Sequence, residues 1–82
     1  MPSDSSVHDA IRRLVDEEHQ LRAYRPGPAL EHAAQAERLR AVEVELDQCW
    51  DLLRQRRALR TAGADPDTAA VRPENQVERY LQ

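Results

Sequence analysis

The longest stretch without a helix-breaking residue runs from Ala29 to Ala62, and it is followed by Gly63. Neither Gly nor Pro occurs inside it, so no backbone feature interrupts a helix over its whole length. At roughly 1.5 Å per residue, such a helix is about 50 Å long. The sequence therefore predicts one long helix, and Gly63 is the expected C-terminal cap.

A shorter amphipathic helix is predicted from about Ser6 to about Tyr24, after a polar and frayed N-terminus over residues 1–5. Ser6 is the expected N-cap, with Asp9 completing a capping pair. Four apolar residues then recur at helical spacing and form one stripe: Val7, Ile11, Leu14 and Leu21. Pro26-Gly27-Pro28 ends this helix, because Pro restricts the residue before it and lacks an N–H donor.

The break turns the two helices into an antiparallel, coiled-coil-like hairpin. Facing residues should have numbers that sum to about 54. That register places Leu14 beside Leu39 and Val42, and Ile11 beside Val42 and Leu46. It also pairs Arg12 and Arg13 with Glu43, and Glu17 and Glu18 with Arg38. The fold class expected is all-α, as a single small domain over residues 1–82.

The last part of the chain, residues 65–82, is expected to fold back on the long helix. Asp65 can cap a short helix with Pro66 in its first turn, and Pro73 can begin another. The first helix is too short to cover the long helix beyond about Trp50. Another segment must therefore cover Leu52, Leu53 and Leu59. The tail would bring Val77 to Leu52, and Tyr80 to Cys49 and Trp50. A second copy of the chain is the alternative cover.

One segment resembles a known family. LDQCWDLLRQRRALR, followed by GADPDTAAVRP and a closing VERYLQ, is similar to short bacterial proteins classed as a domain of unknown function. The upstream LVDEEHQLR, Leu14 to Arg22, fits the same family, and the resemblance covers nearly the whole chain. It supports the helical fold and a cytoplasmic setting. It carries no catalytic residue, cofactor or site.

Composition narrows the setting and the classes of function. The net charge of −3 argues against general attraction to nucleic acid or to an anionic membrane. A single Cys excludes an intrachain disulfide and fits a reducing compartment. No signal peptide and no apolar run of roughly 20 residues is present. The sequence therefore predicts a soluble cytoplasmic protein.

Enzyme chemistry finds little support in the sequence. The two glycines do not form a phosphate loop, and a thin hairpin offers little concave volume for a small-molecule substrate. Acidic neighbours of Cys49 disfavour a reactive thiol. The best metal-like cluster is Asp16, Glu17, Glu18 and His19, which Glu37 could face, and solvated, ion-paired charges are the commoner explanation for it. We expect neither an enzyme nor a cofactor.

Charges in the long helix are sorted by sign, with the acidic residues first and the arginines later. This order suits the helix dipole, and it also suits an antiparallel second copy centred near Leu52 or Leu53. Arg54, Arg56, Arg57 and Arg60 could instead bind phosphate, although no interleaved aromatic residues support nucleic-acid binding.

Adjacent Cys49 and Trp50 are expected in the core, and a partner hot spot at Trp50 is the alternative. The function expected is self-association or docking on a protein partner. The candidate interface residues are Trp50, Leu52, Leu53, Arg56, Leu59, Arg60, Val77 and Tyr80.

Overall fold

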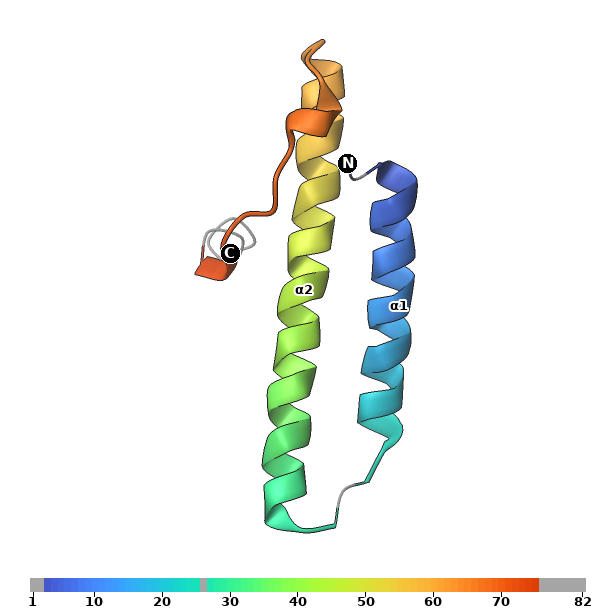
Figure 1. The fold of residues 1–82 in the computed structure, drawn as a ribbon, viewed down its shortest axis with the longest axis vertical. Helices are drawn as coiled ribbons and strands as arrows, with labels where there is room; N and C mark the ends of the chain where they lie inside the picture. The colour runs from blue at the N-terminus through green and yellow to red at the C-terminus, as the bar shows by residue number, and fades with distance from the viewer. Residues whose placement is uncertain (1–2, 26, 76–82) are drawn as a thin grey trace.

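The computed structural model describes residues 3–25 and 27–75, and this part of the chain is all-α. Helix α1 spans Asp4–Ala23, helix α2 spans Ala29–Thr61, and the 3-10 helix η1 spans Pro66–Thr68. The two long helices pack against each other as an antiparallel hairpin, and the chain after α2 returns along it (Figure 1). Within the described ranges there is no strand. The predicted fold class is therefore confirmed.

The start of α1 is set by a reciprocal pair of serines. The Ser3 side chain accepts a hydrogen bond from the Ser6 N–H at 3.1 Å, and the Ser6 hydroxyl accepts one from the Ser3 N–H at 2.8 Å. This capping box moves the helix start two residues upstream of the predicted one. The prediction of Ser6 as N-cap is wrong, and so is that of a frayed Asp4, because Ser3 offers the same hydroxyl one turn earlier.

The connection between the helices is extended. Tyr24 and Pro28 both have β-region backbone angles, with ψ values of 132° and 157°. Extended residues advance the chain about 3.3 Å each, more than twice the helical rise. Helix α2 consequently begins beyond the end of α1 (Figure 1).

Of the ion pairs that the predicted register sets across the hairpin, Glu17 with Arg38 is right and the pairing of Arg12 and Arg13 with Glu43 is wrong. Glu17 accepts a hydrogen bond from the Arg38 Nε at 3.0 Å, as predicted. Glu43, however, is bound by Arg22 at 2.9 Å, and neither Arg12 nor Arg13 reaches it. Arg12 pairs with Asp9 on its own helix, and Arg13 turns toward a groove.

The start of α1 also reaches further along α2 than the predicted register allows. Asp4 should have faced Trp50, but its carboxylate binds Arg56 at 2.5 Å. Part of the leucine-rich half of α2 is therefore covered by α1 itself. The prediction that α1 stops near Trp50 is wrong, because the extended connection shifts the two helices along each other.

A thin apolar core lies between the helices. Its buried residues are Val7, Ile11, Val42, Leu46 and Leu52. Partly buried apolar residues surround them: Leu14, Val15, Leu21, Cys49, Leu53 and Ala69. The core thus joins the predicted stripe of α1 to α2, and Ala69 adds a contact from the returning chain.

A Schellman turn reverses the chain after α2. Gly63 has φ of +76°, the Gly63 N–H bonds the Arg60 carbonyl at 3.1 Å, and the Ala64 N–H bonds the Leu59 carbonyl at 2.8 Å. Asp65 then caps η1 by accepting a hydrogen bond from the Asp67 N–H at 2.9 Å. The predicted reversal at Gly63 and the cap at Asp65 are both confirmed.

The returning segment, residues 69–75, follows α2 backwards. Gln55 donates a hydrogen bond to the Ala70 carbonyl at 2.8 Å, and Arg40 contacts Glu74 at 2.6 Å. The predicted fold-back is confirmed for this segment. The expected contacts of Val77 and Tyr80 lie outside the described residues. Across the described ranges, no helix combines the length and apolarity needed to cross a membrane.

Candidate functional site

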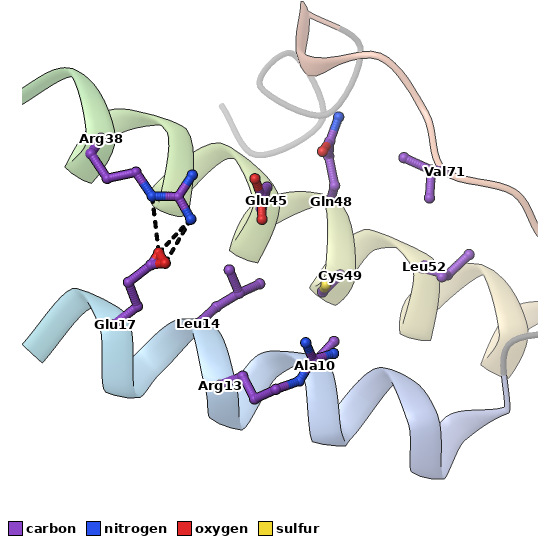
Figure 2. A pocket seen from close by; sticks show the side chains of 10 residues that line it. All are labelled: Ala10, Arg13, Leu14, Glu17, Arg38, Glu45, Gln48, Cys49, Leu52 and Val71. Atoms are coloured by element: carbon purple, nitrogen blue, oxygen red, sulfur yellow. Dashed lines mark hydrogen bonds and ion pairs between the residues drawn. The ribbon is translucent and has the colours of Figure 1, made fainter.

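A groove of about 340 Å³ opens between α1, α2 and the returning segment (Figure 2). Its apolar lining includes Leu14 from α1, Cys49 and Leu52 from α2, and Val71 from the returning segment. Arg13 and Glu45 belong to its charged lining. The groove exists because an α-helix has more circumference than one neighbouring helix and one extended segment can cover.

An ion pair between Glu17 and Arg38 lies at one end of this groove (Figure 2). Two nitrogens of Arg38 reach the carboxylate, with Nη2 lying 2.6 Å from Oε1. The hydrogen bonds that Arg38 donates to Glu17 hold the pKa of Arg38 above its ordinary value. These two charges satisfy each other and tie α1 to α2, which favours a structural role for the pair.

The thiol of Cys49 is poorly suited to nucleophilic chemistry. Burial raises its pKa, the nearby Glu45 carboxylate raises it further, and Arg13 opposes them. A raised pKa keeps a thiol protonated at neutral pH, and the thiolate is the reactive form. Cys49 therefore serves the groove as a small apolar surface.

One buried arginine near the end of α2, Arg56, binds both the start of α1 and η1. Arg56 is only 5% exposed, and its Nη1 donates to the Pro66 carbonyl at 3.1 Å and to Asp67 at 3.0 Å. Its Nε donates to Asp4, which also accepts from Arg60 at 2.7 Å. The hydrogen bonds from Arg60 and then Arg56 lower the pKa of Asp4.

A second buried ion pair, between Asp51 and Arg72, holds the returning segment on α2. Asp51 is fully buried, and it accepts hydrogen bonds from Arg72 at 2.8 Å and from Gln55 at 2.9 Å. The hydrogen bond from Arg72 is the main reason why the pKa of Asp51 is lowered. Gln48 adds a hydrogen bond to the Arg72 carbonyl at 3.1 Å. The returning segment is thus fixed to α2 by the buried carboxylate of Asp51.

The structure divides the predicted interface residues into two groups. Leu52 and Arg56 are buried within the chain, Leu53 packs against the core, and Arg60 is bound to Asp4. Leu59 is half-buried. Trp50, in contrast, is 46% exposed, so its predicted core position is wrong. Val77 and Tyr80 lie outside the described residues.

Several residues of the phosphate-binding and metal-binding alternatives already have partners within the described chain. Arg56 and Arg60, two of the four arginines considered as an alternative phosphate-binding patch, are both bound to carboxylates. In the metal-like cluster, Glu17 binds Arg38 and Glu18 lies 3.6 Å from Arg22. In the part of the chain that the structure describes, no three His, Cys, Asp or Glu residues converge on a metal position.

Sequence reasoning missed the surface on which Trp50 lies. Residues of α2 at alternating steps of four and three share one side of the helix, and none of them belongs to the core cluster. We call this stripe the Trp50 face. Its members are Glu43, Asp47, Trp50, Arg54, Arg57 and Thr61. At its edge, the His8 ring on α1 and the Trp50 indole form a T-shaped contact, with their ring centroids 6.4 Å apart.

Comparison with known proteins agrees with the resemblance of the LDQCWDLLRQRRALR segment. The model of a family described as "Protein of unknown function (DUF2630)" matches residues 3–82. The chain belongs to the DUF2630 family. It is 53% identical over 79 residues to uncharacterized proteins of Mycobacterium bovis and of two Mycobacterium tuberculosis strains. These matches cover 96% of this chain and 91% of each relative. No solved structure matches the chain.

Proposed function

We propose that this DUF2630 protein is a non-enzymatic cytoplasmic protein that docks on another protein chain through its Trp50 face. The observation that carries the proposal is the position of the Trp50 side chain. It is 46% exposed in the middle of the longest helix, while Val42 and Leu46 of the same helix are buried. Exposed tryptophans that become buried on binding are frequent hot spots of protein interfaces.

The surroundings of Trp50 support docking more than catalysis. The raised pKa of Cys49 disfavours nucleophilic chemistry, and the buried charges of Asp51 and Arg56 already have partners within the chain. Those ion pairs fix α1 and the returning segment onto α2, which holds the Trp50 face rigid. A preorganised face loses less conformational entropy on binding. The proposal invokes no cofactor, metal, nucleic acid or membrane.

Capture from native cells tests this proposal. The tagged full-length chain is compared with Trp50→Ala and with Tyr24→Ala, a matched control that removes an aromatic ring 58% exposed in the helix connection. We expect Trp50→Ala to lose at least about tenfold of the captured protein, as hot-spot truncations do, and Tyr24→Ala to retain it. Circular dichroism checks that both variants remain helical. Equal capture by all three chains would contradict docking through Trp50.

A further inference from the structure

We infer that the partner which the Trp50 face fits is a second copy of this chain, with its α2 antiparallel and the two-fold axis crossing the Trp50 face at the level of Leu52, whose own side chain is buried on the opposite side of the helix. This inference rests on the proposed docking through the Trp50 face and names its partner. Of the charged residues on that face, Asp47 and Arg57 form no ion pair within the described part of the chain. Within the described residues, these two opposite charges on one exposed helix face are therefore available to complementary charges of a partner chain.

The spacing of these residues gives the register. Asp47 and Arg57 lie at equal sequence distances on either side of Leu52, and Trp50 and Arg54 do the same. In an antiparallel helix pair related by a two-fold axis at that point, each Asp47 faces Arg57 of the other copy. Each Trp50 faces the exposed part of the other copy's Arg54, whose side chain is 37% exposed and whose buried Nη2 lies 3.8 Å from Asp51 of its own chain. A two-fold interface forms every such contact twice.

The contacts formed are of favourable kinds. Arginine guanidinium groups stack on indole rings through cation–π attraction, and charge pairs set the orientation of helices across an interface. A parallel arrangement would instead place Asp47 against Asp47 and Arg57 against Arg57. Charge complementarity therefore selects the antiparallel pairing over the parallel one.

The size of the face predicts a weak dimer. From Glu43 to Thr61 it is about 27 Å long at the helical rise of roughly 1.5 Å per residue. One helix face of this length buries less than a standard interface, so dissociation in the micromolar range is expected. Such a dimer assembles and separates with protein concentration.

Sedimentation equilibrium of charge-reversed variants tests the register. The purified full-length chain is studied up to about 500 µM with a reductant present, so that no Cys49 disulfide links two chains. We expect Asp47→Arg and Arg57→Asp each to raise the dissociation constant about tenfold, because each turns two attractive contacts into repulsive ones. The double variant, Asp47→Arg with Arg57→Asp, should return to within about threefold of the unsubstituted chain, since every pair is opposite in sign again.

Asp16→Arg is the matched control, since it reverses an exposed charge on α1 outside the Trp50 face and should leave the dissociation constant unchanged. If the chain sediments as a monomer at every concentration, the second copy is not the partner. The docking proposal would then still be decided by the capture experiment with Trp50→Ala. This register would be overturned if neither single reversal changed the dissociation constant, or if the double variant did not restore it. Circular dichroism confirms that each variant is folded.

Discussion

Removing Arg72 is expected to destabilise the protein more than removing Asp51, although both substitutions break the same ion pair. Asp51 is fully buried, whereas the Arg72 side chain is 31% exposed. Arg72→Ala therefore leaves a buried carboxylate that keeps the hydrogen bond from Gln55 and has the Arg54 guanidinium 3.8 Å away. Asp51→Ala leaves a guanidinium that can turn toward water. The asymmetry follows from which charge is stranded away from solvent.

Magnitudes follow from the same contacts. A hydrogen bond to a charged group contributes about 1.5–3 kcal/mol, and breaking a fully buried pair costs about 3–5 kcal/mol. Arg72 itself covers Asp51 from the returning segment, so its removal also lets water approach the carboxylate and lowers the cost. We expect Arg72→Ala to reduce the free energy of unfolding by about 2–3 kcal/mol, and Asp51→Ala by about 1–2 kcal/mol.

Urea unfolding followed by far-ultraviolet circular dichroism at neutral pH measures these losses. Arg40→Ala is the matched control, because it removes an arginine that also binds the returning segment, at Glu74, but is 69% exposed. Its expected loss is about 0–0.5 kcal/mol. The double variant should lose about 1 kcal/mol less than the two single losses added together. Equal losses from Arg72→Ala and Asp51→Ala, or losses that simply add, would refute the reasoning.

Three further predictions concern pH, the reversal after α2 and the thiol. Because the folded pKa values of Asp4 and Asp51 lie below the ordinary 3.8, their ion pairs stabilise the fold above that pH and lose this effect as pH falls; the free energy of unfolding, measured by urea titration, should therefore decline below about pH 4. Gly63→Ala should lower the free energy of unfolding by about 1 kcal/mol because of its positive φ alone, since an added Cβ meets nothing within 4 Å. Gly27→Ala, whose added Cβ also meets nothing, should lower the melting temperature less than Gly63→Ala does. Cys49 should react with a thiol reagent more slowly in the folded chain than in urea, because its pKa is raised; equal rates would contradict its partial burial.

The helices and the reversals were predictable because their causes are local. Pro26-Gly27-Pro28 separates two helices, and the apolar stripe of α1 can be read from the spacing of Val7 and Ile11. Gly63 and Asp65 mark a helix end and a new start through backbone rules that need no neighbours. The start of α1 differs by two residues because Ser3 and Ser6 offer equivalent caps, and the ends of α1 and α2 differ by one residue each.

The candidate site was predicted less well, because burial depends on neighbours distant in sequence. Leu52 and Arg56 were expected at an interface, but α1 and η1 cover them within one chain. Trp50 was expected in the core, since large aromatic residues usually are. Its exposure becomes apparent only when the side of α2 that faces α1 is known. The helical spacing from Asp47 to Arg57 could have revealed the stripe, but not that it stays open.

By itself, the sequence determined the all-α hairpin, its long second helix and the reversal at Gly63, because backbone propensity and apolar periodicity act over a few residues. Only the tertiary structure decided the register of the hairpin, the burial of Asp51 and Arg56, and the exposure of Trp50. A repeating apolar stripe is compatible with several displacements of one helix along another. The choice between them comes from contacts such as Asp4 with Arg56, between side chains at opposite ends of the hairpin's sequence.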